Sequence, residues 1–257
     1  MYKINEDGQI ANEDGQILII VVVGKDGSSG KTTLTKHFLV PQLSPNVKRV
    51  QIETSNSGDG EPDVELAGKY FSQIAGELNM ADAGEEWAID IGSSNFPLMM
   101  ERFKQFPTTR EAITDWLVPV VQTKKSVTDT INTIESLLEI GVAAERITVI
   151  RNNITEPDTL EKDFFPLERF RPMGVNLPLP FIHFTQLFED LKGSNMNVFD
   201  VFADKLDRRA LRKEAMASSD PEEAMRQLMV RTVNYDLAAN SVVNLREVFA
   251  ATPLFKG

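Results

Sequence analysis

A lysine and two threonines stand at the end of a glycine- and serine-rich stretch, GSSGKTT (residues 27–33). Small residues let an anion approach the backbone closely, and N–H groups at a helix start point toward it. In this pattern Lys31 would contact the β- and γ-phosphates of a nucleotide, and the Thr32 hydroxyl would contact Mg²⁺. The alternative is a tight turn with a surface lysine. The candidate nucleotide-binding residues of this stretch are Gly27, Ser28, Ser29, Gly30, Lys31, Thr32 and Thr33.

An aspartate near the end of an apolar stretch is the second chemical feature. Asp90 lies in EWAIDI (residues 86–91), which GSSN follows. In a chain with a phosphate-binding loop, such a carboxylate holds Mg²⁺ through water. We therefore expect Thr32 and Asp90 to form a Mg²⁺ site beside the phosphates of a nucleotide. The alternative is an aspartate that caps a helix or shapes a loop.

The glycine pattern of the loop is incomplete. The usual motif has a glycine six residues before its lysine, and that position holds Lys25 here. Gly24 lies one residue too early, while Gly27 and Gly30 remain. The stretch from Gly27 to Thr33 is still a small-residue loop that a phosphate can approach.

The elements around the loop have the pattern of a parallel α/β sheet. Residues 17–23 form an unbroken apolar run, as expected of a strand buried on both faces, and a helical pattern follows the loop until Pro41. Strand and helix patterns then alternate, which predicts a doubly wound, mainly parallel sheet with ligands beyond the carboxyl ends of its strands. Further strands are expected at 47–54, 86–91, 116–122, 146–150 and 177–184, and helices at 63–79, 95–106 and 126–140.

Pattern also divides the chain into three regions. NEDGQI occurs at 5–10 and again at 12–17, and each copy has the Asp-Gly pair typical of hairpins. Residues 1–16 are therefore expected to form either a β-hairpin or a leader. Residues 17–184 are the expected nucleotide-binding core. Residues 185–257 are expected to be helical, with a helix from Pro221 to about Phe249. This C-terminal region would pack on the core or on a partner.

Composition excludes several classes of protein. The 257 residues include no cysteine, which rules out disulfides and thiolate metal sites, and only His37 and His183 represent histidine. No apolar run is long enough to cross a bilayer, so we expect a cytoplasmic protein without a membrane span. The net charge of −11 opposes direct binding to nucleic acid. One basic stretch is diluted by acidic residues and favours a solvated helix face over a DNA contact: Arg208, Arg209, Arg212 and Lys213.

Several stretches within residues 17–155 resemble StbB-type plasmid stability proteins, which belong to the ParA/MinD branch of P-loop ATPases. They are GSSGKTT with KHFLVPQL, IETSNSGDG, AIDIGSSN, and NTIESLLEIGV with ITVIRNN. The resemblance implies a deviant Walker A ATPase that dimerises around ATP and helps to maintain or position plasmid DNA. It also implies a DNA-binding adaptor protein as partner, which suits the acidic balance of this chain.

The resemblance implies roles for individual residues. Lys31 and Thr32 match the P-loop lysine and the magnesium residue, and Asp90 matches the Walker B acid. Glu53 lies where the family has acids at the end of the second strand. With Lys25, the candidate catalytic residues are therefore Lys31, Lys25, Glu53 and Asp90. Asn152 or Asn153 matches the asparagine that contacts adenine.

Two departures from the family pattern bear on catalysis. The signature lysine, expected five residues before Lys31, is replaced by Asp26, with Lys25 one residue earlier. Either Lys25 serves from a longer loop or the contact to the partner subunit is missing. The water-orienting aspartate expected two residues after Glu53 is Ser55, so hydrolysis would be slow unless Glu53 or Asp59 substitutes.

Three functions remain open from the sequence. The leading hypothesis is an ATP-dependent dimerising switch with weak ATPase activity, acting in plasmid stability, partition or conjugative transfer. A second is a nucleotide-binding scaffold without useful catalysis, with the helical C-terminal region carrying the function. A third is a small-molecule kinase or ligase that resembles dethiobiotin synthetase, with SNSGDG or GSSN shaping a substrate pocket.

Overall fold

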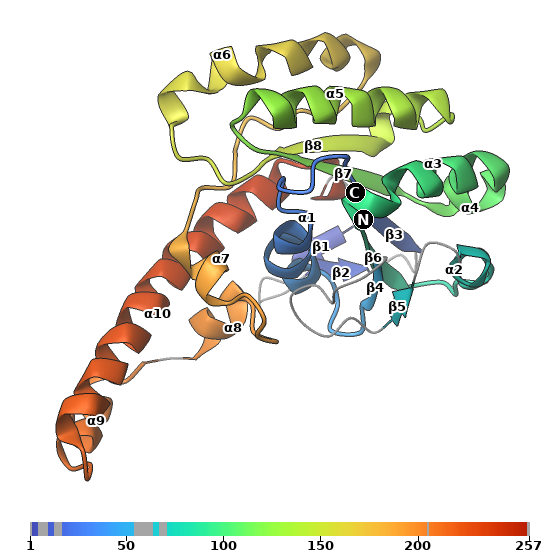
Figure 1. Cartoon of the computed structure of the whole chain (residues 1–257). Coiled ribbons are helices and arrows are strands. Elements are labelled where there is room, and N and C mark those ends of the chain that lie inside the picture. The colour runs from blue at the N-terminus through green and yellow to red at the C-terminus, as the bar shows by residue number, and fades with distance from the viewer. Residues whose placement is uncertain are drawn as a thin grey trace.

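A six-stranded parallel sheet forms the centre of the molecule (Figure 1). A computed structural model of the chain describes residues 2–4, 10–12, 17–53, 64–66, 71–204 and 206–255. The sheet has the order β5-β4-β6-β3-β7-β8. The expected doubly wound parallel sheet is thus confirmed. Its strands are β3 (Leu18–Val22), β4 (Lys48–Ile52), β5 (Val64–Leu66), β6 (Glu86–Ile91), β7 (Asp115–Val120) and β8 (Ile147–Arg151).

Strand β3 lies between β6 and β7, which explains its unbroken apolar sequence. Each of its five residues is buried, and alternate side chains enter different cores because a strand has a two-residue period. Ile19 and Val21 join the core on one face of the sheet, and Ile20 and Val22 join the core on the other face. The phosphate-loop stretch follows directly from the carboxyl end of this strand.

Helices cover both faces of the sheet. The core that contains Ile19 includes side chains from α2 (Phe71–Asn79), α3 (Phe96–Gln105), α5 (Lys124–Glu139) and α6 (Leu160–Phe164). The core that contains Ile20 is filled by a short helical run after the loop and by three later helices. These are α1 (Lys31–Thr33) with the π-helical turn Leu34–Leu39, and α7 (Gln186–Asp190), α8 (Val198–Ala203) and α10 (Pro221–Ala250).

Shorter elements complete the described chain. Strands β1 (Tyr2–Ile4) and β2 (Ile10–Asn12) form a separate antiparallel pair, and most of the two NEDGQI copies lies outside the described residues. Helix α4 (Pro107–Ala112) packs beside α2 and α3, and α9 (Arg208–Met216) packs beside α10. The 3₁₀ turns are Val40–Gln42, Ser93–Asn95, Ala144–Arg146, Pro157–Thr159, Phe165–Met173 and Pro253–Phe255.

Pro119 lies within β7, an interior strand, although proline normally removes a ladder bond there. The last bond between β3 and β7 joins the N–H of Val23 to the carbonyl of Leu117. Residues two apart on a strand point the same way, so an N–H at position 119 would point toward β3, as the carbonyl of Leu117 does. The paired register of β3 and β7 ends at Leu117, so Pro119 lies just beyond the end of this ladder.

Three expectations about the elements were wrong. The stretch expected as one helix at 63–79 contains helix α2 from Phe71 to Asn79, whereas Val64–Leu66 pairs with β4 as an edge strand. Residues 177–184 form no strand: His183 makes one isolated bridge to Ile154, and two prolines in this stretch remove donors. Pro41 does not stop the helix after the loop but lies inside its final 3₁₀ turn.

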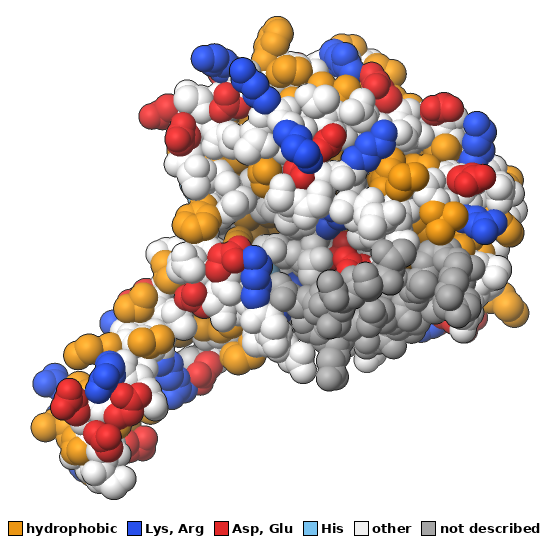
Figure 2. Space-filling model, viewed as in Figure 1, with side chains coloured by type: hydrophobic (Ala, Val, Ile, Leu, Met, Phe, Trp, Pro, Cys, Tyr) orange, Lys and Arg blue, Asp and Glu red, His pale blue; other side chains and the backbone are white. Residues whose placement is uncertain are grey.

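The C-terminal helices extend from the body as an arm, here defined as residues 206–237 (Figure 1). Helix α9 and the first half of α10 pack against each other, whereas the second half of α10 enters the core. Figure 2 shows hydrophobic and charged side chains intermixed on the arm. None of the helices in the described part of the chain combines the length and hydrophobicity that a bilayer crossing requires. Exposed apolar residues of the arm are Met216, Met229, Val230 and Val233.

Two faces of the second half of α10 should differ in their contribution to stability. Leu245 is 1% exposed and belongs to the core, whereas Val243 on the same helix is 69% exposed. Replacement of Leu245 by alanine should lower the free energy of unfolding by about 2–4 kcal/mol, because it leaves a cavity. Val243→Ala should change it by less than about 0.5 kcal/mol. Urea unfolding of both variants measures the difference, and equal effects would show that α10 does not pack as described.

Candidate functional site

The loop after β3 needs glycine at one position above all. Gly30 has φ +80°, and a Cβ added there would lie 2.4 Å from the Nδ2 atom of Asn152. At Gly27 an added Cβ would lie 3.2 Å from the Ser93 hydroxyl. Lys25, in contrast, has no positive φ. The glycine that the motif lacks at this position is therefore not required by the backbone conformation.

The side chain of Lys31 is folded into the loop. It is 6% exposed, and its Nζ donates a hydrogen bond of 2.7 Å to the carbonyl of Asp26. Burial lowers the pKa of Lys31, while the charges of Asp90, Asp26 and Glu53 oppose that shift. The ammonium is thus held beside the loop backbone, where it has one described acceptor and further capacity to donate.

Thr32 and Asp90 meet at the carboxyl ends of β3 and β6. The Thr32 hydroxyl donates a 2.8 Å hydrogen bond to Oδ2 of Asp90, while Oδ1 of Asp90 is buried without a partner among the described residues. Burial raises the pKa of Asp90 to about 6, although the Thr32 hydrogen bond and the charge of Lys31 oppose the rise. A hydroxyl and a carboxylate with a free oxygen fit the hard oxygen chemistry of Mg²⁺.

A cavity of about 440 Å³ adjoins the loop. Glu53, which follows β4, is one of its lining residues. Ser55 and Asp59 lie outside the described residues. Lys25, Asp26, Ser29 and Asp90 are not among the lining residues, which are Gly27, Ser28, Gly30, Lys31, Thr32, Thr33, Glu53, Gly92, Ser93, Val121, Asn152, Asn153, Phe184, Thr185, Phe188, Glu189 and Lys192.

The two candidate asparagines differ in environment. Asn152 is 3% exposed, and its Nδ2 donates a 3.0 Å hydrogen bond to the carbonyl of Ser29. Its amide therefore ties the end of β8 to the phosphate loop. Asn153 is exposed, has φ 57° and also lines the cavity. Of the two, Asn153 has the side chain that is better placed to meet a nucleotide base.

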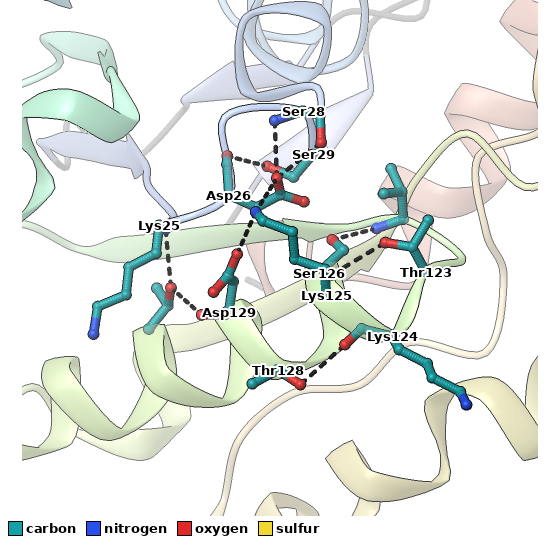
Figure 3. A network of polar contacts seen from close by, with 12 residues as sticks. Lys25, Asp26, Ser28, Ser29, Thr123, Lys124, Lys125, Ser126, Thr128 and Asp129 are labelled. Carbon is teal, nitrogen blue, oxygen red and sulfur yellow. Dashed lines mark hydrogen bonds and ion pairs between the residues drawn. The ribbon is translucent and has the colours of Figure 1, made fainter.

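Lys25 and Asp26 point in different directions (Figure 3). Lys25 is exposed, and its Nζ lies 5.4 Å from the ring centroid of Phe96. Asp26 is 3% exposed and turned toward the loop and α5. The position that the family resemblance reserves for a lysine thus holds a buried acid, and the nearby lysine lies away from the cavity.

Sequence reasoning missed one wall of the cavity. It comes from the segment around α7, which was expected only to belong to a helical C-terminal region. His37, after the loop, stacks on Phe188 with ring centroids 5.0 Å apart. Burial and the charge of Lys36 lower the pKa of His37 to about 3, so this histidine is a neutral packing group. No motif in the sequence marks the wall residues, which are Phe184, Thr185, Phe188, Glu189 and Lys192.

The parallel sheet with helices on both faces is a doubly wound α/β fold, and the loop after its central strand has the strand–loop–helix setting of a P-loop motif. No family model and no curated protein matches the sequence. Solved structures provide more distant comparisons.

One similar structure is McdA of Cyanothece in complex with ATP, with 12% identity, a TM-score of 0.47, and coverage of 72% of this chain and 90% of that chain. Another is the MinC:MinD cell division complex of Aquifex aeolicus, with 13% identity, a TM-score of 0.47, and coverage of 82% and 96%. A third is a putative plasmid partition protein of Borrelia burgdorferi B31 bound to AMPPNP, with 9% identity, a TM-score of 0.46, and coverage of 84% and 100%. Identities of 9–13% and TM-scores of 0.46–0.47 do not assign a function to this chain.

The loop geometry predicts that alanine destabilises the protein at Gly30 but is tolerated at Gly24. Gly30→Ala should lower the free energy of unfolding by about 1–3 kcal/mol, because alanine is strained at this φ and its Cβ would displace Asn152. Gly24→Ala should cost less than about 0.5 kcal/mol, since its Cβ would lie 3.9 Å from its nearest neighbours. Urea unfolding compares the two variants, and an equally tolerated Gly30→Ala would contradict the described loop.

The buried carboxylate predicts a pH-dependent gain from its removal. A group whose pKa rises on folding destabilises the folded state as the pH climbs from its unfolded pKa to its folded pKa. For Asp90 that interval runs from 3.8 to about 6. In nucleotide-free protein, Asp90→Asn should therefore raise the free energy of unfolding by about 1–3 kcal/mol at pH 8 and by less than about 1 kcal/mol at pH 4.

Chemical unfolding at the two pH values measures this difference. The exposed Asp82→Asn provides the control and should change little at either pH. An Asp90→Asn variant that loses stability at pH 8 would contradict the assignment of an unfavourable buried charge.

Proposed function

We propose that the chain is a nucleotide-dependent switch of ParA/MinD type that binds ATP with Mg²⁺. The observation that carries the proposal is the contact between Thr32 and Asp90 beside Lys31, at the carboxyl ends of adjacent strands. A loop amide cradle, a lysine, a hydroxyl and an acid with an unpartnered oxygen are the groups that a magnesium–triphosphate complex requires. The adjoining cavity supplies the space for the rest of the nucleotide.

Each residue has a role in this proposal. N–H groups of residues 27–33 and the Lys31 ammonium would hold the phosphates, and Thr32 with Asp90 would hold Mg²⁺, the latter through water. Bound Mg²⁺ would neutralise phosphate charge. Glu53, at the cavity, is the candidate for orienting water, and Asn153 is the candidate for contacting the base. Burial of the loop by neighbouring elements would strengthen these electrostatic contacts.

The wider role rests on the resemblance to StbB-type proteins. In this proposal, residues 17–184 form the nucleotide-binding core, and residues 185–257 form a region that packs on it and reaches a partner. ATP would drive homodimerisation, and a DNA-binding adaptor would link the cytoplasmic dimer to plasmid DNA during plasmid stability, partition or conjugation. The net charge of −11 is the reason for an adaptor in place of direct DNA binding.

A scaffold with little catalysis is the second candidate, and one observation favours it. Asp26 is buried, and Lys25 lies away from the cavity, so this loop supplies no second lysine to the phosphates within one subunit. A transferring phosphoryl group needs positive charge around it. The proposed ATPase activity is accordingly weak. Of the two stretches named for the kinase or ligase hypothesis, SNSGDG lies outside the described residues, and GSSN contributes Gly92 and Ser93 to the cavity.

Light scattering tests the proposed switch. The mass of the purified protein is measured with ADP, with ATP and with a non-hydrolysable ATP analogue, each with Mg²⁺. The triphosphates should raise the mass to that of a dimer. Lys31→Ala should weaken nucleotide binding by about 10- to 100-fold, because a charged hydrogen-bond donor is lost. Lys162→Ala on the exposed surface of α6 is the control and should behave as wild type.

Lys25→Ala separates the two catalytic possibilities. If this variant binds ATP but stays monomeric, Lys25 reaches across to a partner subunit. If it dimerises normally, the loop operates without a lysine from this position. If the wild-type protein has the same mass with every nucleotide, the switch hypothesis is overturned. Tight ATP binding without dimerisation would favour the scaffold hypothesis.

A further inference from the structure

A buried acid lies directly beside the proposed anion site. The carboxylate of Asp26 is 3% exposed and sits within the phosphate loop. Its negative charge opposes a polyphosphate ligand, and the opposition is strong because buried charges are poorly screened. A phosphate-binding loop that contains such a residue requires a compensating cation nearby.

Asp26 is also the residue that organises the loop. Its Oδ1 accepts hydrogen bonds from the backbone N–H of Ser28 at 2.9 Å and from the hydroxyl of Ser28 at 2.8 Å. Its carbonyl accepts from the Ser29 hydroxyl at 3.1 Å and from Nζ of Lys31 at 2.7 Å. The residue therefore cannot be exchanged for a cation without a loss of loop structure.

The first turn of α5 supplies the cation. Nζ of Lys125 lies 3.5 Å from Oδ1 of Asp26 and 2.7 Å from Oδ2 of Asp129, so the ammonium bridges the two acids (Figure 3). The neighbouring Ser126 hydroxyl bonds the Asp26 carboxylate and accepts from the backbone N–H of Val121. The loop is thus joined to α5 by an ion pair and a hydroxyl bridge.

The charged groups that face Asp26 are Lys31 from the loop and Lys125 from α5, with Asp129 behind the latter. Burial by itself would raise the pKa of Asp26. Hydrogen bonds from Ser28 and Ser126 and the charge of Lys125 outweigh burial and hold the pKa below its ordinary value. Asp26 is accordingly ionised at neutral pH, and its charge has to be balanced.

We propose that Lys125 is a positioning residue of the phosphate loop, whose ammonium neutralises Asp26 so that the loop keeps its shape while it binds an anionic nucleotide. The inference rests on the proposed function and adds a residue from another element to it. Lys125 acts through Asp26, since it does not line the cavity itself. The side chain of Lys125 is 73% exposed, so its removal should leave the fold intact.

Calorimetric titration with Mg²⁺-ATP at pH 8 tests the role. Lys125→Ala should bind ATP about tenfold more weakly, because the ionised Asp26 then repels the bound anion without a neighbouring cation. Lys125→Arg should bind as wild type, because the guanidinium restores the charge. Lys124→Ala, one residue earlier and exposed, is the matched control.

The double variant Asp26→Asn with Lys125→Ala distinguishes charge balance from simple packing. It should bind ATP more tightly at pH 8 than Lys125→Ala alone, because the uncompensated charge is gone. A Lys125→Ala variant that binds as wild type, or a double variant that is no better than the single one, would overturn the inference.

A nucleotide-free measurement separates this inference from the proposed function. Urea midpoints of wild type, Asp26→Asn, Lys125→Ala and the double variant form a cycle whose coupling reports on the pair alone. A wild-type protein that binds no ATP would defeat the proposed function. In that case, a coupling free energy between Asp26 and Lys125 would still support the pairing of the loop with α5. A coupling free energy of zero would overturn that pairing.

Discussion

The hydrogen bond from Thr32 to Asp90 is the contact on which the site depends. It joins the turn after β3 to the end of β6, and it exists because those strands are neighbours with Val22 opposite Asp90. That register in turn depends on burial of β3 on both faces. The arrangement leaves one oxygen of a buried carboxylate without a partner, which is unfavourable until a ligand supplies one. Assembly of the core therefore leaves a buried carboxylate oxygen at the proposed magnesium site without a partner among the described residues.

The site draws on parts of the chain that are far apart in sequence. Asn152 follows the edge strand β8 and reaches the loop backbone, and its amide sits where a side chain on residue 30 would be. Phe188 of α7 stacks on His37 directly after the loop. The helices after residue 185 therefore pack into the same core as the parallel sheet, through α7 and the second half of α10. The two regions named from sequence pattern share one hydrophobic core.

Elements with strong local signals could be predicted from the sequence, and those defined by tertiary pairing could not. Strand β6 was expected at 86–91 and is Glu86–Ile91, and the long helix from Pro221 was expected because Asp220 and the proline mark its start. The small-residue loop at 27–33 could also be predicted, from the types and spacing of its glycines and serines. Val64–Leu66, however, has three residues whose strand character comes only from pairing with β4. The Asp26 side chain is buried because it contacts α5, and α7 lines the cavity because of how that helix packs on the core. Neither arrangement is visible in the local sequence.

The arm has a mechanical consequence. Helix α10 continues without interruption from its buried half, which includes Val242 and Leu245, to its free end at Pro221. At 1.5 Å per residue, the part before the buried half is about 25 Å long. A rotation of about 10° at its root would then carry the tip through roughly 4 Å, a displacement set by helix geometry. Because α7 contacts α10 and also lines the cavity, a rotation at the root of the arm would be passed to α7, beside the proposed nucleotide site.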